Sequence, residues 1–249
     1  MSIFTNHMMA AAASRAGRAA TVYTIDNSCI FNFATASYIT RTPSVTTDTR
    51  TWTISFWFKL CTLANATSGG IVLFTAGTTE IKISDTNDKL YISDGTTFKT
   101  TNGVFRDFTA WNHIVIAADT TSGTAGNRLK LYVNGEIASL ATDTAPDEDF
   151  SFNINSTEAH VIGQEGSNYM DGYISEFYLI DGTQEEAADF GETNTRGVWV
   201  PKAYTGSYGT NGFFLDFESS GDLGNDVSGN NNDFSLTNID SSDQSTGTP

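Results

Sequence analysis

The clearest metal-binding chemistry in the sequence lies near the C-terminus, in the stretch DVSGNNNDF. Four oxygen-bearing side chains fall there at short spacing: Asp226, Ser228, Asn230 and Asp233. Carboxylate, hydroxyl and amide oxygens are the ligands that Ca²⁺ prefers, but the stretch lacks the glycine position and the distal glutamate of an EF-hand loop. Asn and Asp beside Gly also form Asx-turns without a metal. We favour the turn, and keep these residues, with Asp171 as a weaker addition, as a candidate calcium site; no other cofactor is predicted.

Catalytic side chains form no recognisable constellation in the sequence. The three histidines, His7, His113 and His160, are scattered, and Cys29 and Cys61 lie in separate predicted strands. A nucleophile needs a base within hydrogen-bond reach, and no spacing here indicates one. Two cysteines do not by themselves establish a disulfide. We expect a protein that is not an enzyme.

The charge of the chain narrows the classes of partner. A net charge of −16 argues against nucleic acid, because phosphate binding needs a basic face. No stretch reaches the length of a membrane span, so we expect no membrane partner either. The first residues lack the apolar core of a secretion signal, which predicts synthesis in a cytoplasm.

From residue 22 onward the chain alternates apolar and polar residues with period two. In TWTISFWFKL, for example, Ile54, Phe56 and Phe58 face one way. Similar short segments are GIVLFTA, EIKIS, KLYIS, HIVIAAD, RLKLYVNG, AHVIG, YISEFYLIDG and GFFLDF. Turn dipeptides recur at Asp94-Gly95, Asn134-Gly135, Asp171-Gly172 and Asp181-Gly182. Many short strands with frequent turns predict an all-β, two-sheet antiparallel jelly-roll sandwich over residues 22–249.

The stretch WNHIVIAADTTSGTAGNRLKLYVNGE predicts a pair of neighbouring strands. Its inward positions, expected to share one core, are Ile114, Ile116, Leu129, Leu131 and Val133. The polar link between the strands only has to cross the surface. Asn134-Gly135 then reverses the chain, so that residues 136–141 pair back.

Residues 1–21 differ from the rest, because HMMAAAASRAGRAA is the one strong helix-forming run. A helix this short is marginal in water alone, so it either frays, packs on its own domain or anchors the protein in an assembly. The anchoring alternative makes Met8, Met9, Arg15 and Arg18 candidate assembly residues.

Three elements in the middle of the chain carry a family resemblance: Trp111 with His113, Leu131 to Gly135, and Gly172 with Ile174 and Phe177. This order and spacing resembles the laminin-G-like, concanavalin A-like lectin/glucanase superfamily. The resemblance implies the concanavalin A-like form of the sandwich, in which His113 is structural.

The flanks resemble structural proteins of tailed phages, especially marine and cyanobacterial ones. The two segments are YTIDNSCIFNFATASYITRTPSVTTDTRTWTISFWFK and GVWVPKAYTGSYGTNGFFLDFESSGDLGNDVSGNNNDF. This likeness implies a virion protein, made in the host cytoplasm, that is a capsid-surface, fibre or tail component. The implied partners are other virion proteins and further copies of the same chain.

The superfamily resemblance also implies two kinds of glycan chemistry. Host surface polysaccharide is the expected ligand of a binding module, and the candidate aromatic residues in loop-like, Gly-rich surroundings are Tyr169, Trp199, Tyr204 and Tyr208. The same aromatics are equally typical of a lid over the sandwich core or of an interface. A retaining glucanase needs two carboxylates about 5 Å apart, and no strand carries such a pair. Glu176 stands among apolar neighbours, and we expect it on a solvent face.

Overall fold

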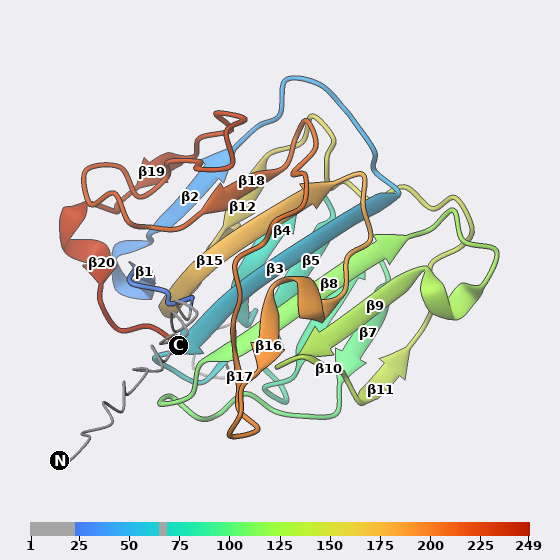
Figure 1. The fold of residues 1–249 in the computed structure, drawn as a ribbon, viewed down its shortest axis with the longest axis horizontal. Coiled ribbons are helices and arrows are strands. Elements are labelled where there is room, and N and C mark those ends of the chain that lie inside the picture. Colours follow the sequence, from blue (N-terminus) through green and yellow to red (C-terminus); the bar gives the residue numbers. More distant parts are fainter. Residues whose placement is uncertain (1–22, 65–68) are drawn as a thin grey trace, which may run out of the picture.

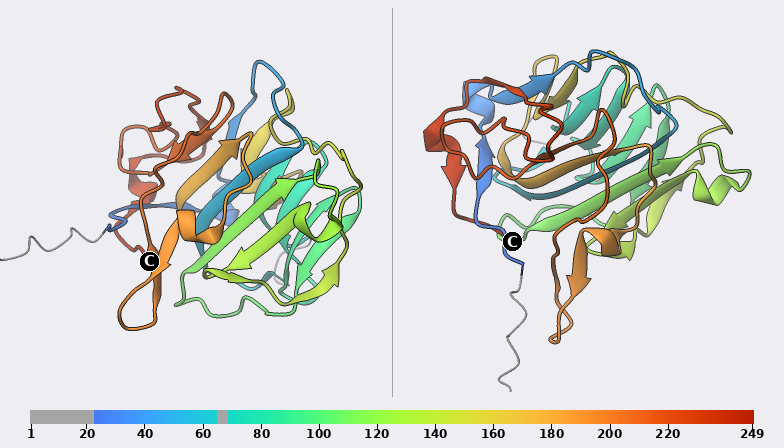
Figure 2. Two further views of the ribbon diagram at one scale, coloured as in Figure 1. Left: turned by 45° about the vertical axis from the view of Figure 1, so that its right-hand side comes forward. Right: turned by 45° about the horizontal axis from the view of Figure 1, so that its top comes forward.

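The computed structural model describes residues 23–64 and 69–249. Within these residues the chain forms two antiparallel sheets of eight strands, which face each other as a sandwich (Figures 1 and 2). The all-β sandwich prediction is confirmed. The predicted arm of residues 1–21, with Met8, Met9, Arg15 and Arg18, lies outside the described residues, and the domain boundary at residue 22 stays a prediction.

The first sheet runs in the order β10 (Glu136–Ile137), β9 (Leu129–Val133), β8 (Asn112–Asp119), β3 (Thr51–Leu60), β15 (Gly172–Asp181), β1 (Ser28–Phe31) and β20 (Gln244–Ser245), and β18 (Phe213–Leu215) also pairs with β15. The second sheet runs in the order β11 (Leu140–Asp143), β7 (Thr97–Thr101), β6 (Leu90–Asp94), β5 (Thr79–Ile83), β4 (Ile71–Ala76), β12 (His160–Ile162), β2 (Tyr38–Arg41) and β19 (Ser235–Thr237).

Two short hairpins and several single turns of 3₁₀ helix complete the described structure. The hairpins are β13 (Gln164–Glu165) with β14 (Asn168–Tyr169), and β16 (Gly191–Thr193) with β17 (Trp199–Pro201). The 3₁₀ turns are η1 (Phe33–Thr35), η3 (Ala125–Asn127), η4 (Ala187–Asp189) and η5 (Ser241–Asp243). Among residues 23–64 and 69–249, no helix combines the length and apolarity needed to cross a membrane.

The core between the sheets follows from the period-two pattern. Ile54, Phe56 and Phe58 of β3 are fully buried, as predicted, and the ring of Phe56 stacks on that of Phe177 with centroids 5.0 Å apart. The inward residues of β8 and β9 join the same cluster. Full burial of one such side chain stabilises the fold by about 1.5–3 kcal/mol.

The outer face of the first sheet is covered too. A second hydrophobic cluster lies there, made of Val115, Tyr132, Tyr178, Ile180, Ala187 and Phe190. The β16–β17 hairpin crosses in front of this sheet, and its tip extends past the strands (Figures 1 and 2). Among the described residues, this cluster and the hairpin thus cover the outer face of the first sheet.

The Asn134-Gly135 hairpin forms as predicted, with both residues at positive φ (49° and 86°). The backbone N–H of His113 donates to the side-chain oxygen of Asn134 at 2.8 Å, which ties the turn to β8. The pairing predicted for residues 136–141 is wrong beyond Ile137, because β11 joins β7 in the second sheet. This crossing lets Leu140 pack against the core from the other sheet.

Candidate functional site

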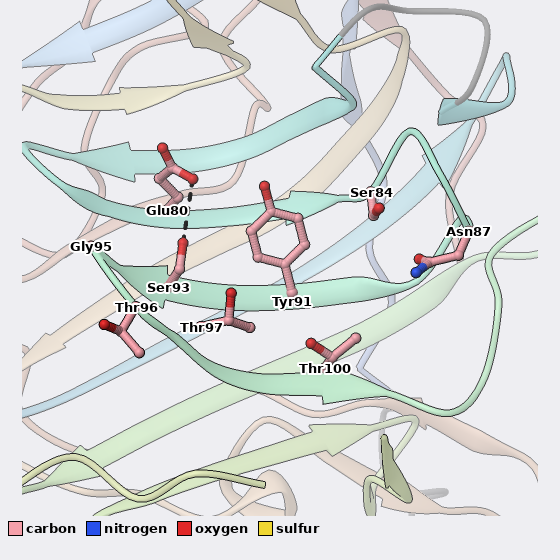
Figure 3. Close-up of a pocket in the computed structure, with 9 residues that line it drawn as sticks. All are labelled: Glu80, Ser84, Asn87, Tyr91, Ser93, Gly95, Thr96, Thr97 and Thr100. Atoms are coloured by element: carbon pink, nitrogen blue, oxygen red, sulfur yellow. Dashed lines mark hydrogen bonds between the residues drawn. The ribbon is translucent and has the colours of Figure 1, made fainter. Parts of the chain in front are cut away.

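An open polar groove lies on the outer face of the second sheet, over β5, β6 and β7 (Figure 3). Its volume is about 500 Å³. The lining residues are Glu80, Ser84, Asn87, Tyr91, Ser93, Gly95, Thr96, Thr97 and Thr100. They supply hydroxyl, amide and carboxylate groups around one aromatic ring.

The strand alternation places these side chains. In β5, Ile81 and Ile83 are buried in the core, so the side chain of Glu80 points outward. In β6, Leu90 and Ile92 are buried in the core, so Tyr91 and Ser93 point outward. The register then sets Glu80 opposite Ser93, and Tyr91 opposite Thr100. The groove therefore follows from the side-chain alternation in β5 and β6 and from the pairing of the strands.

Tyr91 stands in the middle of the groove. Figure 3 shows its ring between Glu80 and Ser93 on one side and Ser84 and Asn87 on the other. The ring is half-buried, and burial raises the pKa of its hydroxyl. The phenol therefore stays neutral and can both donate and accept hydrogen bonds.

One wall of the groove carries a charged cluster. The Lys82 ammonium lies 2.5 Å from a carboxylate oxygen of Glu165 and 3.6 Å from one of Glu80, and its side chain is 8 % exposed. Burial, and then the neighbouring Glu165, raise the pKa of Glu80. Burial alone would raise the pKa of Glu165 as well, but the Lys82 ammonium, which donates a hydrogen bond to it, holds that pKa below its ordinary value.

The Glu80–Glu165 pair cannot be seen in the sequence pattern of a single strand, because Glu80 lies in β5 and Glu165 lies in the β13 hairpin. Two carboxyls whose pKa values are pushed apart are an arrangement that acid–base catalysis uses. Here, however, the Lys82 ammonium pairs with both carboxylates, which ties up the groups that a glycosidase would need free. No observation on the described residues is positive evidence of catalysis.

The predicted aromatic residues do not form one site. Trp199, Tyr204 and Tyr208 pack together with the second hydrophobic cluster, on the side of the sandwich away from the groove. Tyr169 lies apart, beside Phe33 and Tyr38. The packing has the form of a lid over the first sheet, and glycan binding by these four residues stays a prediction.

Trp199 anchors that lid through His113. Its indole N–H donates to Nδ1 of His113 at 3.1 Å, and Nε2 of His113 lies 2.9 Å from the Ser55 hydroxyl. Because an indole N–H can only donate, Nδ1 must be the acceptor and Nε2 must carry the proton. Burial lowers the pKa of His113 to about 3, so the ring is neutral. Its predicted structural role is confirmed.

The candidate calcium residues form a hydrogen-bonded turn. One oxygen of Asp226 accepts from the backbone N–H groups of Phe214 and Ser228, each at 2.9 Å. The other accepts from the Ser228 hydroxyl and the backbone N–H of Asn232, each at 2.8 Å. Asp233 caps the backbone N–H of Asp226 at 2.9 Å. These donors occupy both Asp226 oxygens, which is the Asx-turn geometry that we favoured.

The remaining candidate ligands, Asn230 in the same turn and Asp171 just before β15, are held by other contacts. Asn230 donates from its amide to the carbonyls of Gly209 and Gly212, and Asp171 lies at the start of β15, where its backbone carbonyl accepts from Cys61. In the part of the chain that the structure describes, no three His, Cys, Asp or Glu side chains gather as metal ligands. Cys29 and Cys61 are both free thiols.

The expected position of Glu176 is wrong. Glu176 is only 4 % exposed, and its carboxylate accepts hydrogen bonds from the hydroxyls of Tyr23 and Tyr178. A β-bulge between Ser175 and Tyr178, with Glu176 at a φ of 49°, places Glu176 on the outer face, and it is buried there because Tyr23 and Tyr178 lie against it. The bulge shifts the alternation, so that Phe177 enters the core and Glu176 turns to the covered outer face.

Comparison with known proteins gives the family. Residues 33–188 match the family model described as the concanavalin A-like lectin/glucanases superfamily. No curated protein sequence gives a significant match.

Several solved structures are similar to the chain at low sequence identity and with TM-scores below 0.5. A native heptameric SAP-like pentraxin from Limulus polyphemus is similar at 16% identity and a TM-score of 0.45, over 65% of this chain and 78% of that chain. Mouse laminin alpha1 domains LG4-5 are similar at 9% identity and a TM-score of 0.43, over 74% of this chain and 46% of that chain. Domain 4 of the arabinanase AbnA from Geobacillus stearothermophilus, in complex with arabinotriose, is similar at 18% identity and a TM-score of 0.39. This similarity covers 56% of this chain and 64% of that chain. Because the family model spans well over half of the sequence, the chain belongs to the concanavalin A-like lectin/glucanase superfamily.

Proposed function

We propose that the protein is a structural component of a bacteriophage virion that displays a lectin-like sandwich, and that the groove around Tyr91 binds host surface glycan. The observation that carries the binding proposal is the groove itself, where Tyr91 is surrounded by Glu80, Asn87 and a series of Ser and Thr hydroxyls. Membership of a superfamily that includes lectins supports the same conclusion.

The chemistry of the groove suits a sugar. Sugars present hydroxyls that donate and accept hydrogen bonds, together with C–H faces that pack on aromatic rings. Tyr91 offers a ring, while Asn87 and the hydroxyls of Thr97 and Thr100 offer donors and acceptors on both sides of it. A few oriented polar groups around an apolar platform is the usual composition of a small-ligand site, and about 500 Å³ is an ordinary volume for one.

A glycan array tests the binding proposal with the full chain and two variants. Tyr91→Ala is expected to lower the affinity for a bound glycan by about tenfold or more, because the aromatic ring on which the sugar packs is lost. Tyr169→Ala is the matched control, since it removes a half-buried tyrosine that the groove does not contain. Far-UV circular dichroism establishes that both variants fold. A silent array overturns the proposal, and loss of binding in Tyr169→Ala alone moves the site to the surroundings of Tyr169.

We propose binding rather than hydrolysis because Lys82 forms ion pairs with both Glu80 and Glu165, the two carboxyls that approach each other at the groove wall. Reducing-sugar release from bacterial envelope polysaccharide is therefore expected to stay at background. If wild-type protein released reducing sugar and Glu80→Gln did not, the protein would be a glycoside hydrolase and the binding proposal would be wrong.

The virion assignment rests on the resemblance of residues 23–59 and 197–234 to structural proteins of tailed phages. We further propose that residues 1–21 attach the sandwich to other virion proteins and that the protein assembles as a homo-oligomer, since particle components follow the symmetry of the particle. Mass spectrometry of purified particles, and a map of the intact particle, test the location. Deletion of residues 1–20 should abolish incorporation while the purified domain stays folded, and normal incorporation of the deletion variant contradicts the anchoring role.

A further inference from the structure

The groove contains acid without a matching base. Of the nine residues that line it, Glu80 is the one charged side chain, and no lysine or arginine is among them. Glu80 is held in place at its rim by the Ser93 hydroxyl, 3.3 Å away, and its side chain is 24 % exposed. A ligand that fills the groove therefore meets this carboxyl.

The lysines of the groove strands are already paired. Lys82 of β5 lies between Glu80 and Glu165, and Lys99 of β7 forms an ion pair with Asp143 of β11. Both lysine side chains are nearly buried, at 8 % and 5 % exposure. Neither ammonium is therefore available to a ligand anion without breaking an ion pair. Lys89, next to the Asn87 end of the groove, is not a lining residue.

A carboxylate or sulfate on a sugar would meet Glu80, whose ion-pair partner Lys82 is shared with Glu165, so that the cluster of two carboxylates and one ammonium keeps a formal net charge of −1. Like charges juxtaposed at an interface are strongly unfavourable. A sugar hydroxyl, in contrast, can donate to Glu80, and a hydrogen bond to an ionised acceptor is stronger than a neutral one. The same carboxyl thus favours one class of glycan and opposes the other, which is how a binding site obtains specificity.

We propose that Glu80 is the residue that makes the groove select uncharged glycans over carboxylated or sulfated ones. This inference rests on the proposed glycan-binding function of the groove and names its ligand class. It also predicts that acidic envelope polysaccharides are poor ligands unless their charges are masked.

The test uses pairs of probes that share a backbone and differ in charge. An α-1,4-oligogalacturonate and its fully methyl-esterified form share one backbone, and a wider array adds neutral β-glucans and chitooligosaccharides with their sulfated or carboxylated counterparts. The wild-type chain is expected to bind the neutral member of each pair about tenfold or more tightly. Glu80→Gln keeps the shape of the side chain and should reduce that preference to about threefold or less, mainly by improving binding of the acidic member.

The control variant is Glu192→Gln, which makes the same change in net charge on an exposed residue of the β16 hairpin, away from the groove. It is expected to leave the preference unchanged, which separates a local effect from the overall charge of −16. Lys89→Gln provides a second check, because an acidic glycan recruited by that lysine would lose affinity in this variant.

The outcomes distinguish the two proposals. If neither neutral nor acidic glycans bind, the proposed function itself fails. If glycans bind but both members of the pairs bind equally, or Glu80→Gln leaves the preference as it was, glycan binding stands and the role of Glu80 is overturned. Tight binding of acidic glycans that depends on Lys89 overturns it as well.

Discussion

The hydroxyl of Tyr178 donates a 2.7 Å hydrogen bond to a carboxylate oxygen of Glu176, and both residues are buried on the outer face of the first sheet. The pKa of Glu176 is raised to about 7, chiefly by burial; the hydroxyls of Tyr23 and Tyr178 act to lower it, and the charges of Asp216 and Glu218 act to raise it. The folded protein thus holds this proton to a higher pH than the unfolded chain does.

A pH-dependent stability follows from that shift. A carboxyl whose pKa is raised in the folded state stabilises the fold most below its ordinary value of 4.5, and this contribution is lost as the pH rises to about 7. The shift corresponds to about 3 kcal/mol in the free energy of unfolding. Glu176→Gln should therefore remove a fall of about that size between pH 4.5 and pH 7, measured by urea denaturation at several pH values.

The comparison must be made between variant and wild type, because His113 and His160 act in the opposite direction. Burial lowers their pKa values to about 3 and about 4, so these neutral rings destabilise the fold increasingly as the pH falls below 6.5. Identical pH profiles for Glu176→Gln and wild type would contradict the raised pKa.

The Trp199–His113 hydrogen bond predicts a specific loss of stability. Trp199→Phe keeps an aromatic ring but removes the indole N–H, so Nδ1 of His113 is left buried without its donor. We expect the free energy of unfolding to fall by about 1–3 kcal/mol. Trp111→Phe is the control, because Trp111 is half-exposed just before β8 and its ring contacts are with Tyr173 and Lys59. Equal losses in the two variants would remove the argument.

Gly135 predicts a second structural effect through the same tryptophan. A Cβ at Gly135 would lie 2.4 Å from Cε3 of Trp199, whereas a Cβ at Gly182 would meet no atom within 4 Å. The two glycines have nearly the same φ, 86° and 87°, so an alanine at either pays a similar backbone cost. Gly135→Ala should therefore be less stable than Gly182→Ala by about 1–3 kcal/mol, measured by thermal and chemical denaturation. A smaller loss at Gly135 would mean that the ring moves freely.

Substitution of Asp226 distinguishes a metal-free turn from a calcium site. Because four donors occupy its oxygens, Asp226→Ala is expected to cost about 3 kcal/mol or more of stability in the absence of any metal. Asp233→Ala, which removes one hydrogen bond of an exposed residue, should cost about 1 kcal/mol. Millimolar CaCl₂ or a chelator should leave the unfolding midpoint of the wild-type protein unchanged. A midpoint that rises with calcium and depends on Asp226 would establish the metal site instead.

Local patterns in the sequence predicted much of the fold. The inward residues of β3, β8 and β9, and the turn at Asn134-Gly135, depend on side-chain alternation and on residues that tolerate positive φ, and both are properties of short segments. The groove was within reach of the same reasoning, because EIKIS and KLYIS carry Glu80 and Tyr91 at outward positions. Its recognition needed the pairing of those two strands, which the pattern of each strand alone does not contain.

The sequence by itself determined the class of the protein: short alternating strands and frequent Gly-containing turns permit a sandwich, and the spacing from Trp111 to Phe177 marks its superfamily. The tertiary structure decided which polar groups meet. It set Tyr91 beside Glu80, packed Trp199 and Tyr204 over the second cluster, and buried Glu176 on the covered outer face of the first sheet, at a bulge. The physical reason is that alternation fixes only which side of a strand a residue occupies. Register, bulges and the choice of sheet depend on contacts between segments far apart in the chain.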